Sequence, residues 1–218
     1  MPQVLERKFS IEKTQKNFSA VTKFYDFWAK LTESKAIDTA LEKVDAISRG
    51  KILDIGVGTG DMFYKIMPFN KEGYNIGLDI SPQMLFKAKS KLKDNNESKT
   101  ALILGNAFYL PFEDNSFDYI FSSYVFDLFP ENEFGKVTQE IYRVLKLNGK
   151  AIIITMSFGC RWYNKFWFLL AKYFPSILTN CRPINLKPFI ENTFKNVNAF
   201  SISQNTFPSE ILTAVKNN

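Results

Sequence analysis

Three alternating glycines, Gly56, Gly58 and Gly60, end the run KILDIGVGTG that starts at Lys51. Glycine permits positive φ and lets a ligand approach bare backbone amides. Asp79 follows nineteen residues after Gly60. At the end of the second strand, its carboxylate could accept hydrogen bonds from the hydroxyls of a ribose. The spacing therefore predicts a nucleotide-type site between a strand and a helix N-terminus.

The chain has no histidine, which removes the commonest general base and the commonest metal ligand. Only two cysteines are present, Cys160 and Cys181, so a zinc site would need carboxylates and we predict no metal. Two cysteines fit free thiols in a reducing compartment.

Charge and hydropathy limit where the protein is expected to be located and which partners it is expected to bind. No apolar run approaches the ~20 residues that span a bilayer. The first residues, MPQVLERKFSIEK, are polar and mixed in charge, unlike a signal peptide. We therefore expect a cytoplasmic protein. The net charge of +6 is spread along the chain, and we expect no nucleic-acid partner.

The elements that must position these residues alternate between strand and helix from Lys51 onward. Short apolar runs predict strands at 51–56, 74–79, 101–105, 117–122 and 150–156. Helical spacing predicts helices at 61–67, 82–94 and 131–146. This alternation predicts a doubly wound, Rossmann-like α/β fold with a mainly parallel sheet and helices on both faces. Two final runs, 197–204 and 209–216, predict an antiparallel hairpin that completes seven strands.

The length of 218 residues predicts a single domain. We expect it to contain a helical N-terminal cap, a ligand-binding core, an aromatic helical insertion and the closing hairpin, over residues 1–48, 49–156, 157–192 and 193–218.

The residue after the third glycine limits which nucleotide-type ligand the turn can bind. Dinucleotide enzymes use G-x-G-x-x-G and place pyrophosphate on the helix amides. Here Asp61 follows Gly60 immediately and would repel pyrophosphate. An acid at this position is compatible with a ligand that carries an ammonium group, which favours S-adenosylmethionine over NAD.

Four ordered motifs resemble those of class I S-adenosylmethionine-dependent methyltransferases: ILDIGVGTGD, GLDISPQML, LPFEDNSFDYIFSSYVFDLFP and EIYRVLKLNGKAIII. The resemblance is strong over 50–156 and weaker through NCRPINLKPFIENTF to FPSEILTAVK. It is greatest to the group that holds ubiquinone/menaquinone-biosynthesis-type and phospholipid N-methyltransferase-like enzymes.

The resemblance implies a role for each matching residue. The methionine part of the donor would lie against Asp54, Gly56, Gly58, Thr59 and Gly60. Asp79 would bind the ribose diol, and the adenine would contact Ile80, Met84, Asn106 and Ala107. Ser122, Ser123 and Tyr124 would border the sulfonium and the acceptor. S-adenosylhomocysteine would be the product. The family commonly has aspartate where this chain has Asn106, whose neutral carbonyl is a weaker acceptor for the adenine amino group.

Methyl transfer from a sulfonium is an in-line displacement in which the protein mainly aligns the reactants and excludes water. If a base is needed, the candidates are Tyr25, Tyr124 and Asp127. Aromatic side chains crowd the segment 158–174, with basic residues between them. The segment could line an apolar acceptor pocket, rest on a membrane surface, or be a helix buried on the domain.

We therefore expect a methyltransferase with a small hydrophobic or amphipathic acceptor. The alternatives are a phospholipid, amine or thiol methyltransferase of the same fold, or a cofactor-binding protein without catalysis. An RNA or protein methyltransferase is disfavoured because no recognition domain or basic aromatic stripe accompanies the site.

Overall fold

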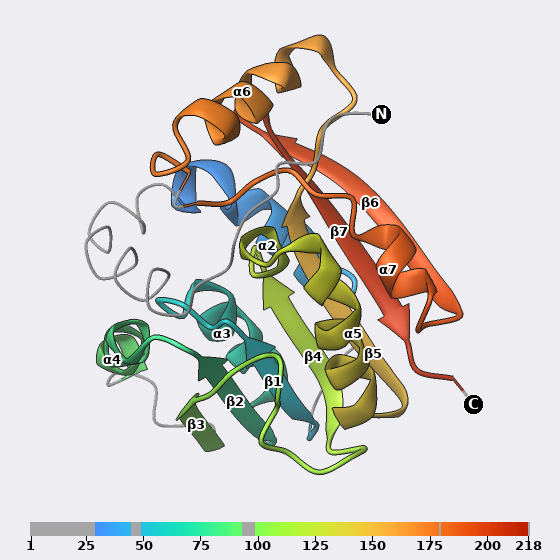
Figure 1. Ribbon diagram of the computed structural model, residues 1–218. Helices are drawn as coiled ribbons and strands as arrows, with labels where there is room; N and C mark the ends of the chain where they lie inside the picture. Colours follow the sequence, from blue (N-terminus) through green and yellow to red (C-terminus); the bar gives the residue numbers. More distant parts are fainter. Residues whose placement is uncertain (1–28, 45–48, 93–98, 179, 218) are drawn as a thin grey trace.

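A computed structural model describes residues 29–44, 49–92, 99–178 and 180–217. One seven-stranded sheet runs through the molecule in the order β3-β2-β1-β4-β5-β7-β6 (Figure 1). Strands β1 to β5 pair in parallel, and the last two strands pair antiparallel with β5 and with each other. This arrangement confirms the predicted fold class. The strands are β1 (Lys51–Ile55), β2 (Tyr74–Asp79), β3 (Lys99–Leu104), β4 (Phe117–Ser123), β5 (Leu145–Met156), β6 (Asn196–Gln204) and β7 (Phe207–Val215).

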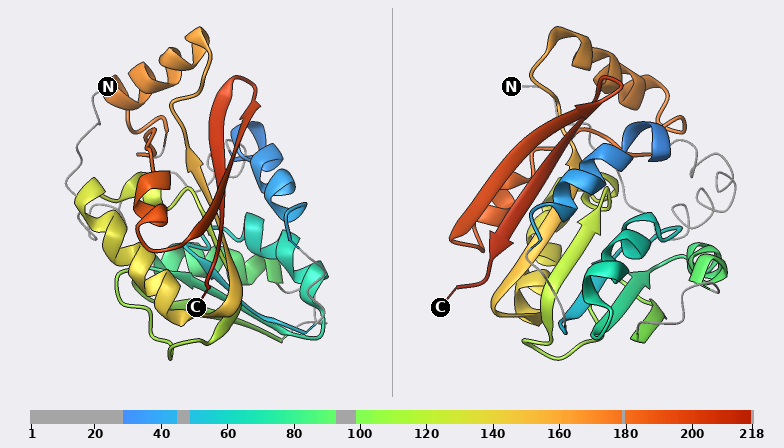
Figure 2. Two further views of the ribbon diagram at one scale, coloured as in Figure 1. Left: turned by 90° about the vertical axis from the view of Figure 1, so that its right-hand side faces the viewer. Right: turned by 180° about the vertical axis from the view of Figure 1, so that it is seen from behind.

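Helices cover both faces of the sheet. Helices α5 and α7 lie on the face toward the viewer in Figure 1, and α2 and α3 lie on the opposite face, seen from behind in Figure 2. Each face has its own buried apolar cluster, as expected for a sheet that is covered on both sides. The α-helices are α2 (Ser34–Leu41), α3 (Asp61–Ile66), α4 (Pro82–Lys91), α5 (Phe134–Val144), α6 (Lys165–Tyr173) and α7 (Lys187–Glu191).

Local chemistry explains the ends of several elements. The hydroxyl of Ser81 caps α4 by accepting from the backbone N–H of Met84, and Pro82 takes the first helical position. A two-residue turn, Asn205-Thr206, joins β6 to β7, and both residues have positive φ. Such turns match the twist of a hairpin. Pro208, expected in this loop, lies in β7 opposite Ser203.

The predicted helix 131–146 is shorter in the structure. A 3₁₀ turn, Glu131–Glu133, precedes α5, and β5 begins already at Leu145 because Leu145 pairs with Phe117. Asn148 has a left-handed φ of 61° and lies inside β5, where the register to β4 shifts. The segment 145–149 therefore bulges from the sheet rather than ending a helix.

The aromatic segment after β5 folds into α6. The indole N–H of Trp167 donates to the hydroxyl of Thr206 over 3.1 Å, and the side-chain amide of Asn164 donates to the Thr206 carbonyl over 2.9 Å. These bonds attach α6 to the tip of the hairpin. No helix within the described ranges is long and apolar enough to cross a membrane. Most of the predicted N-terminal cap, residues 1–28 and 45–48, lies outside the described residues.

Candidate functional site

The turn after β1 is held from β2 and leaves one glycine facing open space. The backbone N–H groups of Gly56 and Val57 both donate to the carbonyl of Leu78. Gly58 has φ +55°, and among the described residues a Cβ added there would meet only the carbonyl oxygen of Gly56, at 3.9 Å. A Cβ on Gly56 would instead collide with Val125, and one on Gly60 with Tyr64. Gly58 is therefore the position where a ligand can approach the backbone.

Asp79 joins the end of β2 to this turn. One carboxylate oxygen accepts from the Gly58 N–H and the other from the Ser81 N–H, each over 2.8 Å. Burial raises the pKa of Asp79, and hydrogen bonds from the backbone of Ser81, Gly58 and Ile80 oppose that rise. Three backbone N–H groups thus bond to this carboxylate, which leaves one of its roughly four acceptor sites for a ligand hydroxyl.

Asp54, at the end of β1, is the least satisfied acid of the site. It is 1% exposed, and neither carboxylate oxygen has a hydrogen-bond partner in the described structure. Burial, and then the nearby charge of Asp79, raises the pKa of Asp54 well above its usual range. A buried carboxylate without partners costs folding free energy unless a cationic or donor group meets it.

Glu33 was not singled out from the sequence. It precedes α2, is 5% exposed, and lines the same narrow cavity as Asp54, Gly58 and Ser123. Burial, with a smaller contribution from Asp61, raises the pKa of Glu33 to about 8. The only sequence signal was one acid beside apolar residues in a helical stretch, because its contact with the glycine turn comes from tertiary packing.

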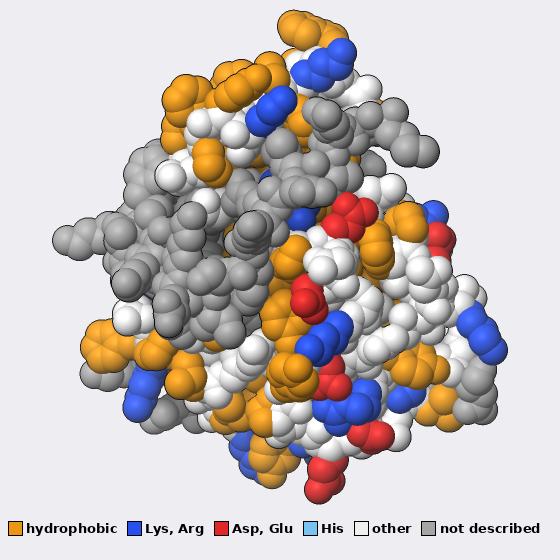
Figure 3. Space-filling view, viewed as in Figure 1, with side chains coloured by type: hydrophobic (Ala, Val, Ile, Leu, Met, Phe, Trp, Pro, Cys, Tyr) orange, Lys and Arg blue, Asp and Glu red, His pale blue; other side chains and the backbone are white. Residues whose placement is uncertain are grey.

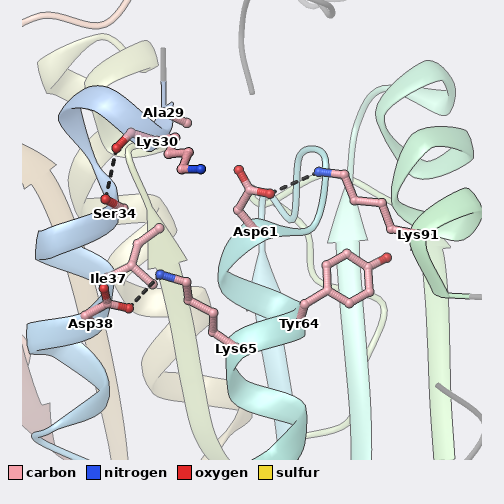
Figure 4. Close-up of a pocket in the computed structure, with 9 residues that line it drawn as sticks. All are labelled: Ala29, Lys30, Ser34, Ile37, Asp38, Asp61, Tyr64, Lys65 and Lys91. Carbon is pink, nitrogen blue, oxygen red and sulfur yellow. Dashed lines mark hydrogen bonds and ion pairs between the residues drawn. The ribbon is translucent and has the colours of Figure 1, made fainter. Parts of the chain in front are cut away.

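Asp61 lies where the predicted ammonium ligand was expected, but it already has a cationic partner. Lys91 of α4 approaches its carboxylate to 3.0 Å. Figure 4 shows this pair in an adjoining cavity of about 720 Å³ between α2, α3 and α4, where Lys65 also pairs with Asp38. Asp54, whose carboxylate has no partner among the described residues, is therefore better placed than Asp61 to meet an ammonium group.

The remaining predicted contact residues surround the same end of the sheet. Met84 and Ala107 are buried and Ile80 is half-buried. Asn106 uses its side-chain oxygen to accept from the backbone N–H of Phe108 over 3.0 Å, so one of its lone pairs is already occupied. Ser123 lines the narrow cavity with Thr59, and Ser122 lies next to it in β4.

The hydroxyls of Ser122 and Ser123 are buried without partners in the described structure. They alternate in direction along β4, so only Ser123 faces the cavity.

The three candidate bases are placed differently. Tyr124 is buried, and its hydroxyl shares a 2.7 Å hydrogen bond with Ser209. Burial, and then the charge of Glu33, raises its pKa well above the usual range. Asp127 is buried and accepts from the backbone N–H of Met156 over 2.9 Å. Tyr25 lies outside the described residues. Neither Tyr124 nor Asp127 lines the narrow cavity beside the glycine turn.

Comparison with known proteins agrees with this geometry. Residues 52–149 match a family model described as a methyltransferase domain. Residues 52–149 are a methyltransferase domain. The matched residues run from β1 to the bulge of β5 and so include the glycine turn, Asp79 and Ser123.

Two relatives of this chain carry the name demethylmenaquinone methyltransferase. A demethylmenaquinone methyltransferase of Lactococcus lactis is 32% identical over 155 residues, which are 69% of this chain and 61% of that protein. A Listeria welshimeri protein of the same name is 35% identical over 153 residues, 67% of this chain and 63% of that protein. The chain thus spans about three fifths of the length of these relatives.

Solved structures share the fold at low identity. A Thermotoga maritima S-adenosylmethionine-dependent methyltransferase, described as a possible histamine N-methyltransferase, aligns with a TM-score of 0.69 at 17% identity and covers 93% of this chain and 99% of its own. A Haemonchus contortus phosphoethanolamine N-methyltransferase solved with S-adenosylhomocysteine aligns at 0.65 and 19%, over 84% of this chain and 53% of its own. S-adenosylmethionine is the cofactor of this class.

Proposed function

We propose that this protein transfers a methyl group from S-adenosylmethionine to a small hydrophobic or amphipathic acceptor. One observation carries the proposal: Gly58 shares a narrow cavity with the unpartnered carboxylate of Asp54 and donates its N–H to the carboxylate of Asp79. A ligand that packs against the Gly58 backbone, places a diol at Asp79 and places a cationic group at Asp54 would satisfy these three residues together. The bound donor supplies a methyl group already activated on a sulfonium.

Each residue of the proposed site contacts a different part of the donor. Asp79 accepts from the ribose hydroxyls, and Ile80 and Met84 pack against the adenine. Asp54 and Glu33 face the ammonium of the methionine part, and its charge offsets the cost of ionising two buried acids. Ser123 offers a hydroxyl on the same side of the cavity. These contacts orient the methyl group and exclude water from it.

The acceptor lies beyond the ends of β4 and β5, on the side of α6. The menaquinone-type relatives favour an amphipathic ring with a nucleophilic carbon as the leading class. An amine, a phospholipid headgroup or a thiol remains the alternative class. An apolar acceptor is stored in membranes, and we propose that residues 158–174 give the protein peripheral contact with one.

A general base is needed only where the acceptor holds its proton tightly. Tyr25, Tyr124 and Asp127 stay the candidates. The hydrogen bonds of Tyr124 and Asp127 to Ser209 and Met156 favour a positioning role for both, because each group is already engaged away from the cavity.

Calorimetry with S-adenosylmethionine and S-adenosylhomocysteine tests donor binding. Binding by the native protein, and its loss in Gly58→Val combined with Asp79→Ala, is the expected result. Unchanged affinity in that variant would refute the site. Release of S-adenosylhomocysteine with a demethylmenaquinol, a thiol, an amine or a phospholipid then identifies the acceptor class. Donor binding without turnover on any of the four would favour the non-catalytic alternative.

A further inference from the structure

Six large apolar side chains are exposed along one stretch around α6. Trp162 is the most exposed, at 83%. Phe166, Leu169 and Tyr173 follow at helical spacing and form one outward stripe. The set, which we call the α6 outer face, is Trp162, Phe166, Leu169, Tyr173, Phe174 and Ile177.

The opposite side of α6 accounts for its attachment to the domain. Trp167 and Ala171 are buried, and the Trp167 ring meets Phe207 of β7 edge-on with centroids 5.1 Å apart. The Trp167 side of α6 therefore packs on the domain, whereas the α6 outer face stays exposed. The apolar side chains of the α6 outer face do not take part in the buried core. A contiguous exposed apolar surface of this kind marks an interaction site.

The charges around this face have one sign. Arg161, Lys165 and Lys172 flank the apolar stripe, and all three are exposed. The chain has 22 acidic residues, yet none occurs from 141 to 190. Figure 3 shows the result at the top of the molecule, where basic side chains stand beside hydrophobic ones. A basic rim around an aromatic and aliphatic stripe complements an anionic lipid surface.

The α6 outer face is also fixed relative to the site. Trp167 and Asn164 bind Thr206 at the hairpin tip, and Ile184, beyond α6, donates its N–H to the carbonyl of Met156 at the end of β5. A surface that lay on this face would therefore lie at the carboxyl end of the sheet, where the proposed acceptor enters.

We propose that the α6 outer face docks on anionic membranes, with its apolar side chains in the interface and its basic rim on the headgroups. The inference rests on the proposed membrane contact of residues 158–174, and it adds which side chains make that contact and which lipid charge they require. Each basic side chain near an anionic surface strengthens binding by roughly fivefold. Loss of two should therefore weaken binding by about 25-fold.

Sedimentation of the full chain with lipid vesicles tests the inference. We expect binding to vesicles of phosphatidylcholine and phosphatidylglycerol in equal parts, weaker binding to phosphatidylcholine alone, and a decline with added salt. Trp162→Ala with Phe166→Ala should reduce binding at least tenfold. Lys165→Gln with Lys172→Gln should reduce it by about 25-fold on the anionic vesicles.

Matched controls lie on α4, far along the chain. Phe86 is 75% exposed and Lys89 is exposed, so Phe86→Ala and Lys89→Gln should leave vesicle binding unchanged. Equal losses in the controls, or no binding by the native protein, would overturn the inference.

Two further measurements separate the other outcomes. Donor affinity by calorimetry should stay unchanged in all four variants, so a failure of vesicle binding is distinguishable from a failure of the proposed function. Sedimentation equilibrium that shows a dimer abolished by Trp162→Ala with Phe166→Ala, without vesicle binding, would assign this face to a second copy and overturn the inference.

Discussion

The carboxylate of Asp79 accepts a hydrogen bond from the backbone N–H of Gly58 over 2.8 Å. The end of β2 therefore holds the turn that follows β1, and the two halves of the proposed donor site are one hydrogen-bonded unit. A change at either residue should disturb both the turn and the diol contact.

Gly58→Ala should weaken donor binding at least tenfold, because the added methyl fills space that the proposed donor would occupy beside the turn. It should also cost about 1 kcal/mol of stability, since φ is +55°. Calorimetry and urea unfolding measure the two effects.

Gly135→Ala is the matched control: it lies in α5, and its added Cβ meets nothing within 4 Å among the described residues. It should raise the free energy of unfolding by roughly 0.5–1 kcal/mol and leave donor binding unchanged. Normal donor binding by Gly58→Ala would contradict the site.

Glu33 should make the ligand-free protein less stable as pH rises. Its pKa is raised from 4.5 to about 8 by burial and then by Asp61, so the folded state holds a proton that the unfolded state releases earlier. This contribution is fully present below pH 4.5 and is lost as pH rises to about 8.

Glu33→Gln should remove that part of the slope, which is of the order of 2–4 kcal/mol. Urea unfolding between these pH values measures the difference between native protein and variant, since Asp54 and Asp79 contribute to both. A constant difference across the range would show that Glu33 does not change its ionisation on folding.

Tyr124→Phe should cost about 1–2 kcal/mol of stability, because it leaves the buried Ser209 hydroxyl without its partner. If Tyr124 positions the β4 end rather than acting as a base, methyl transfer should fall less than tenfold. Tyr142→Phe removes a hydroxyl that donates to the Asn217 carbonyl over 3.2 Å and serves as the control. A fall in kcat of a hundredfold or more with unchanged donor affinity would instead identify Tyr124 as the base.

Arg182→Met should leave stability unchanged or raise it. The guanidinium is fully buried, and in the described structure only one nitrogen has a partner, the Phe129 carbonyl at 2.6 Å. Burial lowers the pKa of Arg182, although the charges of Asp127 and Glu131 oppose this. Replacing a buried, poorly paired charge with an apolar side chain of similar length is often neutral or stabilising by about 1–4 kcal/mol.

Arg182→Ala should instead destabilise by roughly 2–4 kcal/mol, because it leaves a cavity. Thermal unfolding of both variants distinguishes the two effects. A loss of several kcal/mol in Arg182→Met would show that the guanidinium has stabilising partners that its charge requires.

The sequence predicted the parts of the site that depend on local pattern. Gly58 and Asp79 lie at the ends of β1 and β2, and alternation of strand and helix brings consecutive parallel strands together at one edge. The Ser81 cap follows from a rule that spans only three residues. Glu33 was missed because nothing local distinguishes it from a solvated helix acid, and its burial depends on α2 packing across the sheet.

The ends of two elements were set by tertiary pairing. Leu145 fits a helical pattern, yet pairing with Phe117 draws it into β5. The Asn205-Thr206 turn contains no glycine, and its two positive φ values follow from the twist of the flanking strands. These element ends depend on strand partners that are distant in the sequence, so local residue spacing cannot predict them.

Thr206 offers α6 both its backbone carbonyl and its hydroxyl. Helix and hairpin are therefore joined through one residue. Since Ile211 of β7 pairs with Ile154 of β5, a force on α6 would be transmitted through Thr206 and β7 to β5. Strand β5 pairs with β4, which ends at Ser123 beside the narrow cavity, so such a load would reach the proposed donor site through strand pairing.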